Sequence, residues 1–152
     1  ATWGNLTLSA IFGYSIGNDI YNYQRSILES GNNFYNQTSA MTDRWRVEGQ
    51  VTNMPRISYG DEMGNSRFSD RWIEDGSYLK LRSLNINYKI PVNSSWLQGL
   101  QVWAEANNLF TISKYLGGDP EMSVSNAVLY QGIDTGCVSQ GRTFTVGVKI
   151  NL

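Results

Sequence analysis

The stretch that decides the fold is RTFTVGVKINL, residues 142–152. From Phe144 onward every even position is apolar, and the odd positions hold threonine, glycine, lysine or asparagine. A period of two places alternate side chains on opposite faces, which predicts a two-faced β-strand. Its apolar face would meet either the core of a soluble β-sandwich or the lipid around an outer-membrane barrel, and the alternation alone does not choose.

The same alternation recurs in three earlier segments. In one of them, YLKLRSLNINYKI, the apolar residues change parity between Leu81 and Leu84. An extra residue shifts every later side chain to the other face, so we expect a β-bulge near Arg82 and Ser83. The predicted strands cover about 3–17, 77–90, 100–113 and 142–152.

The connections between these strands are very unequal in length. Long structureless loops are uncommon in compact soluble domains, whereas outer-membrane barrels combine short periplasmic turns with long extracellular loops. The pattern therefore favours an all-β, antiparallel transmembrane β-barrel segment. Ile20, Tyr23, Ile27 and Leu28 have helical spacing before Gly31, which predicts one short helix in the first loop. We expect extracellular loops at about 18–71 and 114–141, and a periplasmic turn at about 91–99.

Composition excludes several classes of function. Among 152 residues there is no histidine and one cysteine, Cys137, which excludes a zinc cluster of the usual kind, a Ser-His-Asp triad and an internal disulfide. The formal net charge of -1 gives no electrostatic reason to expect nucleic acid as a partner. We place Cys137 in an outer loop, and its chemical state stays open.

Four strands are too few to close a membrane barrel, since the smallest have eight. Open edges in lipid would leave backbone groups unpaired, at several kcal/mol each. We therefore expect residues 1–152 to be about the last four strands of a larger barrel, whose remainder pairs with this chain.

Several segments together resemble a known family. They are DRWIEDGSYLKLRSLNINYKIP (70–91), NNLFTISKYLGGDPE (107–121), GID (132–134) and the final RTFTVGVKINL, with DRWRVEGQVTNMPR (43–56) upstream. In order and spacing they resemble the C-terminal end of SusC/RagA-type TonB-dependent outer-membrane transporters. One departure is Leu152, which replaces the aromatic residue usual at the end of outer-membrane strands.

The resemblance implies a plugged barrel of the 22-stranded kind in the bacterial outer membrane. It also implies import of glycans or peptides, with energy arriving from TonB through an N-terminal region that this sequence does not contain. The implied partners are the remainder of the barrel and its plug, a SusD-like surface lipoprotein and the lipid bilayer. No enzymatic activity and no cofactor are expected.

The barrel hypothesis assigns a side to each residue of the last two strands. Lysine on the lipid face costs about 2 to 4 kcal/mol near mid-membrane, which places Lys149 inside. Glu105 and Lys149 would line the lumen, pair with each other or contact the plug, and Trp103 would stack in the lumen or pack on the plug. The predicted lumen-facing residues are Trp103, Glu105, Asn107, Thr145, Lys149 and Asn151. The predicted lipid-facing residues are Phe144, Val146, Val148, Ile150 and Leu152.

Charged residues gather where the third segment begins. Glu74 and Asp75 suggest a glycosidase, but adjacent strand residues point to opposite faces, while that chemistry needs two carboxyl groups flanking one bond. We expect a hydrogen-bonded charge network near the outer rim instead. Its members would be Asp70, Arg71, Glu74, Asp75, Lys80 and Arg82.

Three alternatives stay open at this point. A soluble β-sandwich carbohydrate-binding module would use the same alternating strands, and an outer-membrane enzyme would use Glu74 or Asp75. Direct calcium binding by Asp119 or Asp134 is the third, although the ligand spacing of an EF-hand is absent.

Overall fold

The computed structural model describes residues 1–32, 34–93, 96–121, 123–125 and 127–151. The chain forms two compact units. The sheet unit comprises Ala1–Ile16, Ser77–Lys114 and Ser139–Leu152, and the loop unit comprises Gly17–Gly76 and Tyr115–Val138.

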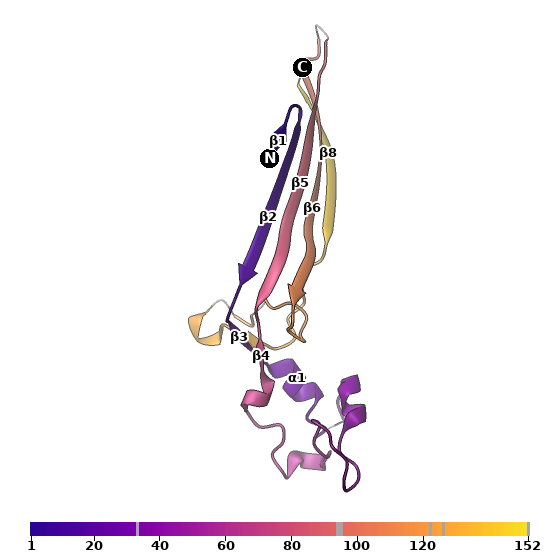
Figure 1. Cartoon of the computed structure of the whole chain (residues 1–152), viewed down its shortest axis with the longest axis vertical. Helices are drawn as coiled ribbons and strands as arrows, with labels where there is room; N and C mark the ends of the chain where they lie inside the picture. The colour runs from indigo at the N-terminus through magenta and orange to yellow at the C-terminus, as the bar shows by residue number, and fades with distance from the viewer. Residues whose placement is uncertain (33, 94–95, 122, 126, 152) are drawn as a thin grey trace. The chain divides into compact units, whose positions relative to one another are not determined.

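The sheet unit is a single five-stranded sheet in the order β1-β2-β5-β6-β8, and its neighbouring strands are all antiparallel. Figure 1 shows its four long strands side by side. The prediction of an all-β, antiparallel fold is confirmed. The strands are β1 (Thr2–Trp3), β2 (Leu6–Ser15), β5 (Tyr78–Ile90), β6 (Gly99–Ser113) and β8 (Thr143–Asn151).

A hairpin precedes the first long strand. Trp3 pairs with Leu6, so Gly4 and Asn5 form a two-residue turn, and Gly4 has a φ of 56° that favours glycine. The segment expected as a strand over about 3–17 is therefore divided between β1 and β2.

The expected β-bulge is confirmed. The register of β5 shifts between Leu81 and Ser83 against β6, and Arg82 has no opposite residue on β2 either. On β6 the register passes from Phe110 to Asn107, and Asn108 between them has a φ of 55°. The bulge restores one continuous apolar face, because Leu79 and Leu81 now lie on the same side as the apolar residues that follow Ser83.

The register places apolar and polar side chains on opposite faces, with Ile11 on the polar face as an exception. One cross-strand row joins Leu8, Ile86, Ala104 and Val146, and the next joins Thr7, Asn87, Trp103 and Gly147 on the opposite face. The apolar face is open in this chain: Val146 is 73% exposed and Phe144 71%. A β-sandwich would cover such a face with a second sheet, so this single layer argues against the soluble alternative.

The loop unit contains a small mixed sheet in the order β4-β3-β7. Strand β3 (Asp19–Asn22) is antiparallel to β4 (Ile73–Asp75) and parallel to β7 (Ile133–Asp134). One α-helix, α1 (Tyr23–Leu28), follows β3 directly. The described residues of the unit also form the 3₁₀ helices η1 (Ser39–Asp43), η2 (Tyr59–Asp61), η3 (Asp70–Trp72) and η4 (Val128–Tyr130).

The predicted helix is present, but it is shorter than its sequence pattern suggested. Ile20 belongs to β3, where it is 2% exposed and opposite Glu74. The side chain of Asn22 accepts a hydrogen bond from the Arg25 backbone N–H at 2.9 Å, which caps the helix and fixes its start. Ile20, the first residue with helical spacing, therefore belongs to strand β3 and not to α1.

The loop unit has a core of its own. Trp72 is fully buried, Ile20 is 2% exposed and Met41 is 3% exposed. The two segments read from the sequence as irregular loops are joined by the parallel pairing of Tyr21 with Ile133, and the Tyr21 N–H donates to the Gly132 carbonyl at 2.8 Å. These two segments are therefore folded, although their sequences look irregular, because contacts between residues distant in the sequence hold them together.

No helix in the part of the chain that the structure describes is long and apolar enough to cross a membrane.

Candidate functional site

The polar face of the sheet unit holds all six residues predicted to face a lumen. They alternate with Phe144, Val146, Val148 and Ile150, which share the opposite face, while Leu152 lies outside the described residues. The rows pair Trp103 with Gly147, Glu105 with Thr145 and Asn151 with Gly99; Asn107 lies opposite Thr143. Which face meets lipid and which meets a lumen stays a prediction.

Glu105 and Lys149 are not neighbours on that face. Lys149 lies opposite Gln101, and the Trp103 row separates it from Glu105, which is about 13 Å along the strand. Glu105 has a different partner: the Asn107 side-chain amide donates to its carboxylate at 3.0 Å. Direct pairing of Glu105 with Lys149, one of the sequence alternatives, therefore does not fit the register.

Trp103 has a structural neighbour that sequence reasoning did not consider. A Cβ added to Gly147 would approach the Trp103 ring at 2.5 Å, so the indole lies over the glycine backbone of the adjacent strand. An aromatic ring covering a cross-strand glycine protects its backbone and helps to fix register. This contact lies between two strands of the same sheet, so it does not depend on whether Trp103 also faces a lumen or the plug.

The charges of the sheet unit are also sorted by face. Among the described strand residues, the apolar face carries no charged side chain. The polar face carries Lys80, Lys89, Lys149 and Glu105, and the Arg82 side chain lies over Gly13 on the same side, since a Cβ there would meet Arg82 Nε at 2.5 Å. The polar face therefore carries more basic than acidic side chains.

The six residues of the predicted rim network are distributed over both units. Asp70, Arg71, Glu74 and Asp75 belong to the loop unit, and Lys80 and Arg82 to the sheet unit. Asp70 opens the 3₁₀ helix η3, and Asp75 lies opposite Asp19 in the β3–β4 pair. A single network of these six stays a prediction.

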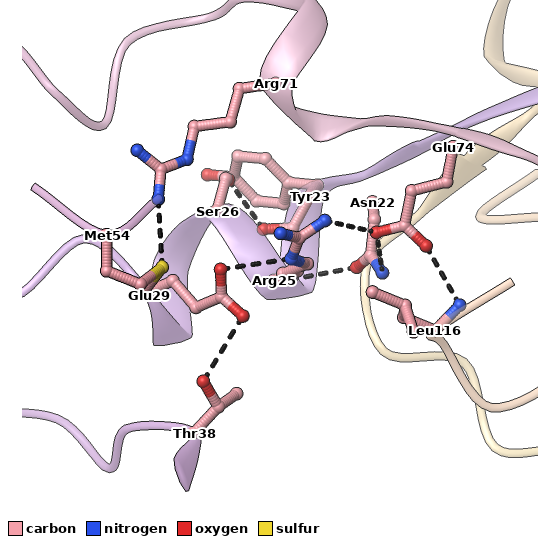
Figure 2. A network of polar contacts seen from close by, with 10 residues as sticks. All are labelled: Asn22, Tyr23, Arg25, Ser26, Glu29, Thr38, Met54, Arg71, Glu74 and Leu116. Atoms are coloured by element: carbon pink, nitrogen blue, oxygen red, sulfur yellow. Dashed lines mark hydrogen bonds and ion pairs between the residues drawn. The ribbon is translucent and has the colours of Figure 1, made fainter. Parts of the chain in front are cut away.

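Glu74 is the centre of a polar network inside the loop unit, as Figure 2 shows. Its Oε1 accepts from Arg25 Nη1 at 2.9 Å and from Asn22 Nδ2 at 3.2 Å, and its Oε2 accepts from the Leu116 N–H at 2.9 Å. Arg25 also pairs with Glu29 at 3.0 Å. The two carboxylate side chains are only 10% and 6% exposed, so the network is buried.

An aromatic ring completes this network. The Arg25 guanidinium lies 5.6 Å from the centre of the Trp72 ring, and the Arg71 guanidinium lies 4.9 Å from it. Burial alone would lower the pKa of Arg25, but the hydrogen bond to Glu74 and the charge of Glu29 outweigh it and raise the pKa. For Arg71, burial lowers the pKa, Glu29 raises it in part, and the nearby charge of Arg25 lowers it again.

Sequence reasoning found Glu74 but missed its partners. Arg25 and Glu29 stand four residues apart in the predicted helix, and that spacing alone indicates a pair on one helix face. Nothing local connects either residue to Glu74. With Arg25 bound to it, Glu74 is a structural carboxylate rather than a free catalytic acid.

The two aspartates considered for calcium hold turns within the loop unit. Asp134 accepts a hydrogen bond from the Tyr115 hydroxyl at 2.5 Å, and also accepts from the backbone N–H groups of Gly136 at 2.8 Å and Cys137 at 3.1 Å. Asp119 accepts from the Glu121 N–H at 3.1 Å. Burial, followed by the bond to Asp134, raises the pKa of Tyr115. Within the described ranges, no group of three or more acidic, cysteine or histidine side chains is arranged to hold a metal.

The loop unit also contains a cavity of about 720 Å³. Tyr21 is one of its lining residues, and its ring lies 4.8 Å from that of Phe68 and 6.5 Å from that of Tyr23. Its other lining residues are Asp19, Ser26, Ser66, Ile73, Val124, Tyr130, Gln131, Gly132, Ile133 and Thr135. No sequence motif indicated this cavity, because its walls come from three distant segments.

Comparison with known proteins gives a consistent family. No protein-family model matches the sequence. The chain is 30% identical over 154 residues to TonB-dependent receptor P3 of Formosa agariphila, covering 96% of this chain and 15% of the relative. It is 27% identical over 163 residues to TonB-dependent receptor P26 of the same organism, covering 98% of this chain and 16% of the relative.

Solved structures show the same fold. The chain matches the structure of the RagAB peptide transporter with a TM-score of 0.80 at 23% identity, covering 98% of this chain and 16% of that one. It matches the RagAB peptide importer in the closed-closed state with a TM-score of 0.79 at 24% identity. These relatives are receptors and transporters, which agrees with the expectation of no enzymatic activity. The chain is thus similar over nearly its whole length to a part of the TonB-dependent receptors of the bacterial outer membrane, in line with the SusC/RagA-type resemblance of its motifs.

Proposed function

We propose that this chain forms barrel wall and outer loops of a TonB-dependent importer of glycans or peptides that works with a SusD-like surface lipoprotein. In this proposal the apolar face of the sheet unit meets lipid and the polar face meets the lumen and plug. Loops 18–71 and 114–141 face outward, and turn 91–99 faces the periplasm. TonB acts through regions of the receptor outside this chain.

The observation that carries the proposal is the uncharged apolar face, continuous over four strands. β2, β5, β6 and β8 are 10, 13, 15 and 9 residues long, and tilted strands of about 9 to 11 residues span a bilayer. An exposed apolar surface of this extent is rare on soluble monomers. Lipid is the partner that such a face fits best.

A surface partner is supported by the loop unit. Its core is packed, yet Phe34 is 94% exposed, Val51 98% and Leu129 87%. An exposed apolar patch marks a surface that another protein covers, and we propose that these side chains belong to one. A SusD-like lipoprotein at the cell surface is the partner that we propose for them.

Spin labels can test the assignment of the two faces. In the full receptor, with Cys137 changed to Ser, single cysteines at 146 and 148 are labelled and compared with cysteines at 145 and 149. After reconstitution in liposomes, labels at 146 and 148 should relax with oxygen, which dissolves in lipid, and labels at 145 and 149 with a water-soluble nickel chelate. The reverse pattern would overturn the assignment.

Uptake tests the activity. Cells that express the receptor are given a mixture of oligopeptides and a mixture of oligosaccharides, and loss of each from the medium is followed. We expect loss of one mixture, abolished in cells without TonB or without the receptor. Uptake that continues without TonB contradicts the proposal. So does a stable, monomeric, two-state 152-residue domain in buffer without detergent.

A further inference from the structure

The cavity of the loop unit is built on regular structure. Tyr21 lies on β3 and Ile133 on β7, and the two residues are directly paired. Gly132, which precedes Ile133, has a φ of 77°, and an added Cβ there would come within 3.2 Å of the Asp19 carbonyl oxygen. Side chains fixed on paired strands give a site that exists before the ligand arrives.

The lining has the character of a ligand site. Its volume of about 720 Å³ falls within the roughly 300 to 1,000 Å³ of small-molecule pockets, which are mostly apolar with a few polar groups. Four aromatic rings line it, and they belong to Tyr21, Tyr23, Phe68 and Tyr130. Two of these aromatic side chains are exposed enough to contact a ligand, since Phe68 is 80% exposed and Tyr130 is 53% exposed.

The aliphatic part of the lining distinguishes between ligand classes. Ile73, Val124 and Ile133 offer methyl groups, which would strip water from sugar hydroxyls without replacing its hydrogen bonds. The same groups, with the aromatic rings, favour an apolar side chain. Among the described lining residues Asp19 alone carries a charge, so a neutral or cationic ligand suits the cavity better than an anion.

We propose that this cavity binds the aromatic side chain of an oligopeptide and thereby selects peptides that carry one. The proposal rests on the importer function proposed above and names a specificity site within it. Tyr21 and Phe68 hold the ring of the ligand, the aliphatic residues exclude water around it, and Asp19 accepts from an amine of the peptide.

The test uses the purified full receptor in detergent and calorimetric titration with three probes: Ala-Phe-Ala, Ala-Ala-Ala and maltotriose. We expect saturable binding of Ala-Phe-Ala, at least about tenfold tighter than Ala-Ala-Ala, and none of maltotriose. Each tenfold change in affinity corresponds to about 1.4 kcal/mol.

Two variants assign binding to this cavity. Phe68→Ala removes one wall at an exposed position, and Val124→Trp fills the space without removing a wall; each should weaken Ala-Phe-Ala binding about tenfold or more. Tyr59→Ala is the matched control, because Tyr59 is an exposed aromatic residue whose ring contacts Phe34 and which is absent from the lining. Equal effects of Phe68→Ala and Tyr59→Ala would overturn the proposal, as would binding of maltotriose or no preference for Ala-Phe-Ala.

The two proposals fail separately. Titration needs neither TonB nor transport, so a receptor that imports in a TonB-dependent manner but ignores Ala-Phe-Ala disproves only the cavity assignment. A receptor whose uptake does not need TonB disproves the importer function, whatever the cavity binds.

Discussion

The sheet unit and the loop unit use apolar residues in opposite ways. Of the six buried hydrophobic residues among those described, only Leu81 belongs to the sheet unit, and Ile20, Met41, Met54, Trp72 and Tyr115 belong to the loop unit. In the sheet unit the apolar side chains form an outer surface. In the loop unit they form a core, with charges buried beside it.

This difference fits the environments proposed above, in which the solvent on each side of a segment decides which side chains are buried. A membrane strand has two different solvents, so its apolar residues alternate and stay exposed to one of them. The loop unit, which we propose to face water, encloses its apolar groups by bringing distant segments together. The predictions below test where this contrast holds.

The largest effect is expected at the core of the loop unit. Trp72 is fully buried and its Nε1 donates to the Arg67 carbonyl at 3.1 Å. Trp72→Ala should destabilise the loop unit by about 3 to 5 kcal/mol, because it leaves a cavity and an unpaired acceptor. Hydrogen exchange in the full receptor should rise in the loop unit and stay unchanged in the sheet unit. Trp96→Ala, at a 69% exposed position, is the control; equal effects would contradict the core assignment.

The next largest effect is expected on the proposed lipid face. Val146→Lys should cost about 2 to 4 kcal/mol if this position is near mid-membrane, while Thr145→Lys on the opposite face should cost much less. Urea titration of the receptor refolded in phospholipid vesicles measures both. A larger loss for Thr145→Lys would show that the two faces are assigned in reverse.

The buried network should respond to loss of its central cation. Arg25→Met leaves Glu29 and Glu74 without their shared partner, and should cost about 2 to 3 kcal/mol, less than a fully buried pair because Arg25 is 23% exposed. Combining it with Glu74→Gln should cost less than the sum of the two. Arg46→Met, which removes only a bond to the Thr42 carbonyl, is the control. Additive losses would mean that the two residues act independently.

A smaller effect is expected where Trp103 covers Gly147. Gly147→Ala pushes a methyl group into the ring and should destabilise the sheet by about 1 to 3 kcal/mol. Changing Trp103 to Leu in the same protein should recover part of that loss. Gly141→Ala is the control, since no atom lies within 4 Å of the added Cβ. Without recovery in the double variant, the ring contact is not the cause.

The smallest effect is a pH dependence in the loop at Asp61. Desolvation raises the pKa of this carboxyl, but hydrogen bonds from Ser66 and Asn65 and the charge of Arg67 outweigh it, so the pKa falls below 3.8. A carboxyl whose pKa is lower in the folded state than in the unfolded state stabilises the fold. This contribution is complete at pH values above the pKa of the unfolded state, and it is lost as the pH falls through the pKa of the folded state. Amide protection at Ser66 should therefore decrease below pH 3.8 and not at neutral pH. Asp61→Asn should remove this dependence, and a loss at neutral pH would contradict it.

The sheet could be predicted from the sequence because its information is local. The alternation of apolar and polar residues predicted which side chains share a face. The change in parity of the apolar positions predicted the bulge at Arg82. Residues on one face were correctly grouped, but their neighbours across strands were not, since register depends on both strands. That is why the contact of Trp103 with Gly147 was missed.

The loop unit could not be predicted because its information is long-range. Arg25 meets Glu74 only after β3 pairs with β4, and the cavity forms only when β7 joins them. Its polar residues look like a solvated loop until their partners are known. Ile20 shows the same effect, because its place in β3 depends on strands far along the chain.

The parallel pairing of β3 with β7 sets an order of assembly. β5 and β6 are joined by the turn at 91–99 and can pair as soon as both have been made, whereas Tyr21 must wait for Ile133. Contacts between distant residues form slowly because a long segment must first be closed into a loop. We therefore expect the β5–β6 pair to form before the β3–β7 pair, and the cavity lined by Tyr21 and Ile133 to form only after the latter.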